Sequence, residues 1–159
     1  MILTIKDNII NSKEEMICHQ VNCKGVMGKG VALAIKNKYR YAYTQYKAFC
    51  KNKEVKDLIS KCNIVKVQSD INPKYIANMF AQENYGYGKC FTNYEAFEIC
   101  ILHVLAYCNM MEIKSIAMPY KIGCGNAGGN WNIIYSLLEK YFGINGTNKE
   151  IKLILYDFN

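Results

Sequence analysis

Long apolar runs are missing from this 159-residue sequence, and none approaches the roughly 20 residues that a helix needs to cross a bilayer. The first six residues also lack the basic start and the long apolar core of a signal peptide. No repeat, low-complexity tract or linker is recognisable. Because 51% of the residues are hydrophobic, the chain can bury a substantial core. We therefore expect one domain over residues 1–159, located in the cytoplasm and without a membrane partner.

Cysteine pairs of the C-x-x-C type are also absent, although the sequence has eight cysteines. Most of the eight lie in apolar runs, where a thiol behaves as a small hydrophobic side chain. We therefore expect reduced thiols, with neither a disulfide framework nor a zinc site, and no other bound metal. The eight are Cys18, Cys23, Cys50, Cys62, Cys90, Cys100, Cys108 and Cys124.

Arginine is almost absent, because Arg40 is the only one among 20 basic residues in a chain of net charge +7. The lysines are scattered along the sequence. Recognition of phosphates and base edges favours the planar arginine fork, and a dedicated nucleic-acid-binding protein gathers its charge on one face. The composition therefore argues against nucleic-acid binding as the main function.

Glycine is concentrated in one stretch, residues 118–131, which has four glycines in seven positions between a strand-like run and an amphipathic helix. Glycine allows left-handed turns and close approach to a ligand, and the free N–H groups of a loop that opens a helix bind phosphate oxygens. The stretch therefore predicts a pyrophosphate site. The alternative is a tight turn that binds nothing.

Strand-like and helical segments alternate along the chain, and a second glycine loop, residues 22–30, leads into a helix that starts at Val31. This alternation predicts an α/β layer structure, in which ligands bind beyond the carboxyl ends of parallel strands. Both glycine loops lie at such ends, so we expect them to hold one ligand from two sides. The expected strands are residues 2–5, 16–21, 64–67, 75–80, 115–118 and 151–156, with a turn around residues 72–73.

Capping signals locate two helices further along the chain. Thr92 and Glu95 have the spacing of a capping box, so a helix should begin there and run to about Met111. Asn130 is the expected N-cap of a helix that Gly143 ends. The expected buried side chains are Phe97, Ile101, Val104, Leu105 and Cys108 in the first helix, and Ile134, Leu137, Leu138 and Tyr141 in the second.

Two other phosphate-binding motifs fit this sequence less well. The P-loop needs Ser or Thr after Gly-Lys, but Gly30 follows Lys29 and Cys90 follows Lys89. Residues 123–128 do match G-x-G-x-x-G, the dinucleotide-binding fingerprint. However, one expected strand remains after this motif, whereas a dinucleotide-binding fold needs a second βαβ half there.

The sequence resembles the macrodomain family in several segments that follow one another in the right order. Residues 19–32 (HQVNCKGVMGKGVA) are similar to the first ADP-ribose loop of small phage and bacterial macrodomains, and residues 118–131 to their second, diphosphate-binding loop. Residues 75–82 and 92–96 also resemble that group. Within this family, the sequence resembles the branch of the terminal ADP-ribose protein glycohydrolases and that of the yeast-type ADP-ribose-1''-phosphate phosphatases. The resemblance implies a three-layer α/β/α macrodomain with a central mixed, mostly parallel sheet of about six strands.

By this resemblance the ligand is ADP-ribose, and the binding positions of the family can be carried over. Asn8, beside Ile9, stands where many relatives have an aspartate that reads the adenine amino group, and an amide oxygen can also accept from that group. Phe158 or Tyr156 would stack on adenine. The distal ribose and one phosphate would contact Val21, Asn22, Gly25, Val26, Met27, Gly28, Lys29 and Gly30, with Asn22 bonding a ribose hydroxyl. The diphosphate would contact Ile122, Gly123, Cys124, Gly125, Asn126, Ala127, Gly128, Gly129, Asn130 and Trp131.

The catalytic positions of relatives are replaced in this sequence. Where relatives carry a carboxylate or its lysine partner, this chain has Ala32, Gln82, Ala127 and Asn130. His19 is a candidate base for a water at the distal ribose, although it also fits a satisfied core histidine, and Asn22 and Gln82 would orient water or substrate. Cys124 is a candidate nucleophile if the loop lowers its thiol pKa, or else a packed thiol. A phosphate oxygen of the ligand could also activate the water.

Two classes of function therefore stay open. One is a cofactor-free, metal-independent hydrolase that removes ADP-ribose from a modified macromolecule, or phosphate from ADP-ribose-1''-phosphate. The other is a module that binds ADP-ribose or a related signalling nucleotide without turnover. An NAD-dependent oxidoreductase is a remote third, supported by the glycine fingerprint alone. We expect a monomer whose partner is ADP-ribose or an ADP-ribosylated macromolecule, and which binds nucleic acid stably only as such a substrate.

Overall fold

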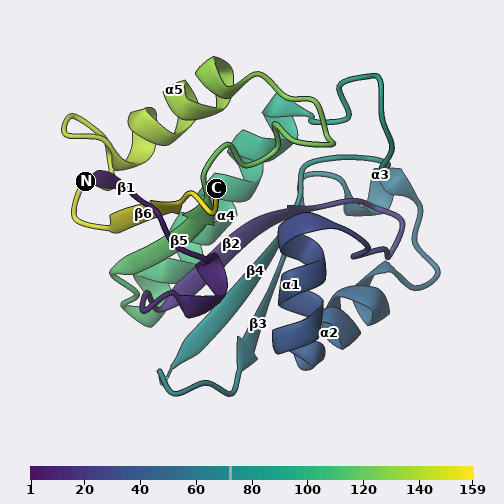
Figure 1. The fold of residues 1–159 in the computed structure, drawn as a ribbon, viewed down its shortest axis with the longest axis horizontal. Helices are drawn as coiled ribbons and strands as arrows, with labels where there is room; N and C mark the ends of the chain where they lie inside the picture. Colours follow the sequence, from purple (N-terminus) through teal and green to yellow (C-terminus); the bar gives the residue numbers. More distant parts are fainter. Residues whose placement is uncertain (72) are drawn as a thin grey trace.

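A computed structural model of the chain describes residues 1–71 and 73–159 (Figure 1). The strands in this part of the chain are β1 (Ile2–Ile5), β2 (Met16–Val21), β3 (Cys62–Val67), β4 (Lys74–Phe80), β5 (Ser115–Pro119) and β6 (Lys152–Tyr156). The helices are the 3₁₀ helix η1 (Ile9–Asn11) and the α-helices α1 (Gly30–Lys38), α2 (Arg40–Cys50), α3 (Val55–Leu58), α4 (Tyr94–Met111) and α5 (Trp131–Phe142). Each expected strand is confirmed, whereas the short helices η1 and α3 were not predicted.

The strands form one sheet in the order β1-β6-β5-β2-β4-β3. The β3–β4 pair is antiparallel and the other neighbouring pairs are parallel. Because β2 and β5 are parallel neighbours, with Met16 opposite Ile116, the glycine loops that follow them leave the sheet at the same edge. The strand order differs from the 3-2-1-4-5-6 order of the dinucleotide-binding fold, so the fold gives the oxidoreductase alternative no support.

Helices cover both faces of the sheet, with α4 and α5 on one face and α1 and α2 on the other (Figure 1). Side chains along β2 alternate between the two layers, as the geometry of a strand requires. Met16 and Cys18 belong to the core shared with α4 and α5, whereas Ile17 packs with Ile35 of α1 and Ala42 of α2. The arrangement confirms the predicted three-layer α/β/α fold with a mixed, mostly parallel sheet.

Asparagine side chains cap the two helices beside the second glycine loop. Asn130 caps α5, as predicted. The N-cap of α4 is Asn93, whose side chain accepts a hydrogen bond from the Ala96 N–H at 2.9 Å, so the predicted capping box at Thr92 is wrong. The cap lies one residue later because the Thr92 hydroxyl donates to the Gly123 carbonyl in the second loop instead.

The expected turn around residues 72–73 includes position 72, which lies outside the described residues. In the part of the chain that the structure describes, no helix has both the length and the hydropathy required to span a membrane. The eight cysteines are free thiols, and residues 1–71 and 73–159 hold no group of three or more side chains able to bind a metal ion.

Candidate functional site

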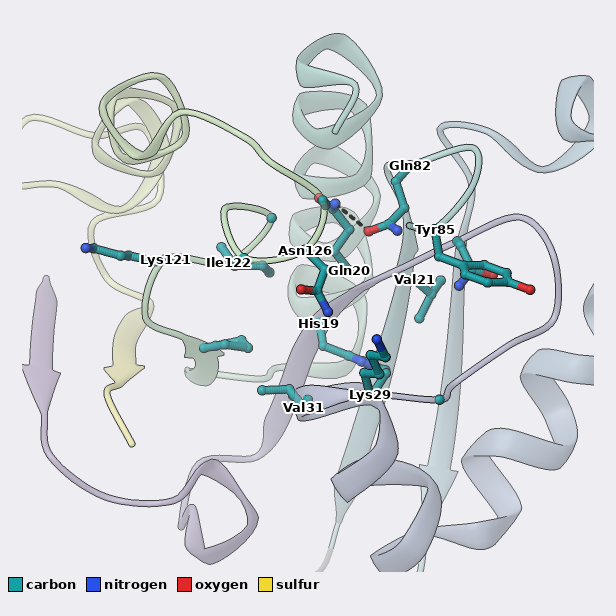
Figure 2. Close-up of a pocket in the computed structure, with 18 of the residues that line it drawn as sticks. His19, Gln20, Val21, Lys29, Val31, Gln82, Tyr85, Lys121, Ile122 and Asn126 are labelled. Carbon is teal, nitrogen blue, oxygen red and sulfur yellow. Dashed lines mark hydrogen bonds between the residues drawn. The ribbon is translucent and has the colours of Figure 1, made fainter. Parts of the chain in front are cut away.

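The two glycine loops border a cavity of about 600 Å³ beyond the carboxyl ends of β2 and β5 (Figure 2). A third segment, residues 82–87 after β4, completes its wall. The structure thus brings the two glycine loops and the three candidate catalytic residues, His19, Asn22 and Gln82, to one cavity. The lining residues are His19, Gln20, Val21, Asn22, Val26, Gly28, Lys29, Gly30, Val31, Ala32, Gln82, Tyr85, Gly86, Tyr87, Pro119, Tyr120, Lys121, Ile122, Gly123, Gly125, Asn126 and Ala127.

The residues predicted to contact adenine lie outside this cavity lining. Asn8 caps η1 through a hydrogen bond from that helix, and Ile9 is a core residue. Phe158 is 71% exposed near the end of the chain. Tyr156 is buried and its hydroxyl donates to the Glu14 carboxylate, so the suggestion that Tyr156 stacks on adenine is wrong. Its ring is part of the hydrophobic core between the sheet and α1.

Some predicted contacts within the two loops do not line the cavity either. They are Gly25, Met27, Cys124, Gly128, Gly129, Asn130 and Trp131. Met27 is a buried core residue. A Cβ atom at Gly128 would lie 2.7 Å from the Lys89 carbonyl oxygen, and one at Gly129 would lie 2.6 Å from that of Gly123. These two glycines therefore allow the loop to pack against backbone of the same chain.

Contacts with the segment before α4 hold the second loop beside the cavity. The Phe91 N–H donates to the Ala127 carbonyl at 2.7 Å, and the Thr92 hydroxyl donates to the Gly123 carbonyl at 2.6 Å. No acceptor in the described residues is bonded to the N–H groups of residues 125–127, which line the cavity. Three successive free N–H groups form a site for an anion.

Helix α1 begins at the cavity, where residues 30–32 belong to the lining. The first hydrogen bond of this helix runs from the Leu33 N–H to the Lys29 carbonyl at 3.2 Å, so the N–H groups of residues 30–32 precede the helical ladder. Lys29 is the N-cap and provides no side-chain cap, and the first turn has no acidic residue. The positive end of the helix is therefore available to an anion.

Asn22 gives the first loop its shape. Its side-chain oxygen accepts hydrogen bonds from the Lys24 N–H and from the Tyr46 hydroxyl, both at 2.9 Å, and its amide donates to the Val26 carbonyl at 2.8 Å. Tyr46 is fully buried beneath the loop. The loop is thus ordered by internal bonds, and the second N–H of the Asn22 amide stays available for a ligand hydroxyl.

Lys29 and Lys121 supply the charge of the cavity lining, and no lining residue in the described part of the chain is Asp or Glu. The Lys29 ammonium group contacts the Tyr87 hydroxyl and lies 4.3 Å from the centroid of that ring. A lining without carboxylates favours an anionic ligand. It also provides no carboxylate to act as a general base.

His19, at the end of β2, belongs to the cavity lining and has one buried nitrogen atom without a partner among the described residues (Figure 2). Its Nε2 lies 2.6 Å from the Asn78 Oδ1, while its buried Nδ1 has no partner among the described residues. Because an amide oxygen can only accept, Nε2 carries the hydrogen and Nδ1 keeps its lone pair. Burial lowers the pKa of His19 to about 4, so the ring is neutral at pH 7.

Gln20 connects two of the segments that form the site, and its role was not predicted. Its amide donates to the Gln82 side-chain oxygen at 2.8 Å, the bond drawn in Figure 2, and to the Thr92 hydroxyl at 3.0 Å. The Gln82 amide in turn donates to the Asn84 carbonyl at 2.8 Å. Two polar residues, His19 and Gln20, at the carboxyl end of a buried strand were the signal that could have found this network.

Tyr85 and Tyr87 also line the cavity without having been predicted. Both are exposed, by 54% and 71%, and they alternate with glycines in residues 85–88.

Cys124 does not line the cavity, and burial raises its pKa above the ordinary thiol value. The hypothesis of a thiol with a lowered pKa is therefore wrong, and Cys124 is a packed residue.

Comparisons with known proteins agree with this geometry. The profile of the Macro domain family matches residues 18–137. A DNA ADP-ribosyl glycohydrolase of Mycobacterium tuberculosis is 31% identical over 142 residues, which are 89% of this chain and 39% of that protein. The chain thus spans about two fifths of the length of this curated relative.

Solved structures show the same fold. The macrodomain of Mycobacterium tuberculosis DarG has a TM-score of 0.82 at 24% identity, over 100% of this chain and 98% of that one. Thermosipho africanus DarTG in complex with ADP-ribose has a TM-score of 0.76 at 22% identity, over 97% of this chain and 40% of that one.

Proposed function

The chain belongs to the macrodomain family, and from that premise we propose that its cavity binds ADP-ribose and promotes hydrolysis of an ADP-ribosyl linkage. One observation supports the proposal: residues 30–32 and 125–127, whose backbone N–H groups have no acceptor among the described residues, line a single cavity without carboxylates. Each cluster suits phosphate oxygens, and a diphosphate has two phosphates to offer them. A volume of about 600 Å³ is also of the size that a small-molecule ligand occupies.

The distal ribose is placed by the first loop and His19 in this proposal. A hydroxyl group of this ribose meets the free N–H of the Asn22 amide, and His19 belongs to the same cavity lining. Gln20 and Gln82 hold each other in position next to these groups and form the wall on the β4 side. The chain therefore offers neutral polar groups for the sugar and backbone N–H groups for the phosphates.

Hydrolysis in this cavity needs a base other than a carboxylate of the lining. The His19 Nδ1 keeps its lone pair, but a pKa of about 4 makes this residue a weak base. A phosphate oxygen of the ligand takes the proton of the attacking water in our proposal. The water oxygen then bonds to the anomeric carbon of the distal ribose, the bond from that carbon to the carrier atom breaks, and the carrier atom takes up a proton from solvent.

Modified DNA is the first substrate to test, because the relative that is 31% identical is named a DNA ADP-ribosyl glycohydrolase. Titration calorimetry with ADP-ribose should show binding, and AMP, which lacks the distal ribose and one phosphate, should bind more weakly. Product analysis should then compare an ADP-ribosylated oligonucleotide, an ADP-ribosylated protein and ADP-ribose-1''-phosphate. Release of ADP-ribose or phosphate no faster than with boiled protein would contradict the hydrolase proposal.

A binding module without turnover is the second candidate, and the lining without carboxylates favours it. It predicts the same calorimetric binding of ADP-ribose, with no product from any of the three substrates after long incubation. Rapid cleavage would exclude it. Absence of ADP-ribose binding under conditions where the protein is folded would contradict both candidates.

A further inference from the structure

The positive charge of this protein comes from one segment of the chain. Residues 16–53 contain eight basic residues and no acidic residue, whereas the rest of the chain contains 12 basic and 13 acidic residues. The net charge of +7 is therefore the +8 of this segment and the −1 of the remainder. The eight are Lys24, Lys29, Lys36, Lys38, Arg40, Lys47, Lys51 and Lys53.

The fold places this acid-free segment largely on one side of the molecule. After β2, it forms the first loop, α1 and α2, which lie together over one face of the sheet (Figure 1). None of its eight cations has a carboxylate within 4 Å among the described residues. Glu54, the first acidic residue after the segment, pairs with Lys56 at 3.5 Å. The expectation of scattered charge therefore does not hold for this layer.

Three of these cations surround one aromatic ring. The charged groups of Lys36, Arg40 and Lys47 lie 4.4, 5.3 and 5.9 Å from the centroid of the half-buried Tyr43 ring. A ring attracts each cation by its quadrupole, but the cations also repel one another in the absence of a carboxylate. An anion between them would remove that repulsion.

A surface hollow of about 610 Å³ lies at this place. We name it the basic hollow, and its lining is Lys24, Gly25, Arg40, Tyr43, Thr44, Lys47, Ala48, Cys50 and Lys51. Lys24 and Gly25 belong to the same loop whose Asn22 and Val26 line the ADP-ribose cavity. One loop therefore separates the two sites, with the basic hollow on the α2 side.

We propose that the basic hollow binds the backbone phosphates of a single-stranded nucleic acid. This inference rests on the proposed function, because the nucleotide that carries ADP-ribose would then stand at the distal-ribose end of the cavity, beside the shared loop. Cations interleaved with an accessible aromatic face are the surface that single strands use, with charge along the backbone and a ring for a base, and Tyr43 is half-buried among these cations. An acidic peptide or an anionic membrane would use the charges but gives the Tyr43 ring no partner to stack on.

The first test measures binding of a fluorescent, unmodified single-stranded oligonucleotide at low salt. Lys47→Glu/Lys51→Glu should weaken binding at least tenfold, because both side chains are exposed in the basic hollow. Lys149→Glu/Lys152→Glu makes the same change in net charge at exposed positions outside it and should change binding less than twofold. Equal losses in the two double variants would overturn the proposal, because net charge alone would then account for binding.

The second test measures the salt dependence of the same binding. Each phosphate contact of a single strand contributes about 0.7 to the slope of log K against log salt, so Lys47→Gln/Lys51→Gln should reduce the slope by about 1.4. An unchanged slope would contradict the proposal, and so would tight binding to anionic vesicles without binding to the oligonucleotide.

ADP-ribose affinity should stay within twofold in the Lys47→Glu/Lys51→Glu variant. If oligonucleotide binding behaves as expected but ADP-ribose does not bind the wild type, the proposed function is contradicted, whereas nucleic-acid binding by the basic hollow is supported.

Discussion

His19 and Asn78 are joined by a hydrogen bond of 2.6 Å between the His19 Nε2 and the Asn78 Oδ1, on adjacent parallel strands. The Asn78 amide in turn donates to the Asn63 side-chain oxygen at 3.2 Å, which fixes the orientation of the Asn78 oxygen toward the histidine. This chain of bonds crosses from β3 to β2 and leaves the lone pair on the His19 Nδ1, which is buried and has no partner among the described residues. The sheet itself therefore sets the tautomer of the histidine.

His19 should make the stability of the protein depend on pH. Its pKa is about 4 in the folded protein and 6.5 ordinarily, so the unfolded chain binds more protons between these values. Stability from this group is complete above pH 6.5 and is lost as the pH falls toward 4, by at most about 3 kcal/mol. Urea unfolding at pH 7 and pH 4.5 should show a larger loss in the wild type than in His19→Gln. Equal losses would contradict a buried neutral histidine.

Asn78→Asp should raise the pKa of His19. A carboxylate next to Nε2 favours the imidazolium form, so we expect an increase of roughly 1 to 3 units. Titration of the histidine signals by NMR measures this directly, with the exposed His103 as an internal reference. The same titration of Asn78→Leu serves as a control without charge. A His19 pKa that stays the same in Asn78→Asp would mean that the two side chains are not in contact.

Gly125→Glu should abolish ADP-ribose binding and leave the fold intact. A Cβ atom at Gly125 meets no atom within 4 Å, and the residue lines the cavity beside the free N–H groups. A carboxylate at this position would repel the diphosphate, whereas Gly125→Ala is the matched control and should still bind. Calorimetry with ADP-ribose measures both variants. Undiminished binding by Gly125→Glu would mean that the diphosphate is held elsewhere.

Gly128→Ala should destabilise the protein by roughly 1 to 3 kcal/mol. Gly128 has a φ of +72°, and its Cβ would lie 2.7 Å from the Lys89 carbonyl oxygen, so the backbone must shift. Gly125→Ala, three residues away, should change stability by less than about 0.5 kcal/mol. Chemical denaturation of the two alanine variants makes the comparison. Similar unfolding free energies would show that the loop does not need the left-handed residue.

Asn22→Ala should lower both stability and ADP-ribose affinity. The change removes the bonds to Lys24, Val26 and Tyr46 that order the first loop, at a cost of roughly 1 to 3 kcal/mol. Tyr46→Phe should cost less on the Asn22→Ala background than on the wild type, because the two side chains share a hydrogen bond. Unfolding of the four proteins completes the cycle, and strict additivity would mean that the hydroxyl donates to the Asn22 carbonyl oxygen, 2.8 Å away, and not to the side chain.

Local sequence patterns were enough to predict the strands, the two glycine loops and one helix cap. The strands were predictable because each is a short apolar run bounded by polar or glycine residues, as in residues 16–21 and 115–119. Loops rich in glycine after two such runs predicted a ligand at one edge of the sheet, and the two loops do border one cavity. Asn130 was a correct N-cap because its partner is the backbone two residues later.

Contacts between distant segments decided features that the local sequence pattern could not predict, such as the N-cap of α4 and the pKa of Cys124. Thr92 has the capping-box spacing but bonds to Gly123, 31 residues away, so Asn93 caps the helix. Cys124 lies in a glycine loop that leads into a helix, which suggested a lowered thiol pKa. Burial raises that pKa instead.

The sequence by itself determined the family, the order of strands and helices, and the loops after β2 and β5 as the place of the proposed ligand site, because these depend on local patterns of apolar residues and glycines. Only the tertiary structure decided which N–H groups of the two loops lack an acceptor, that His19 is neutral with a buried Nδ1 that has no partner among the described residues, and that eight cations scattered in the sequence lie largely in one layer. Each of these depends on which segments, far apart in the chain, are packed against one another.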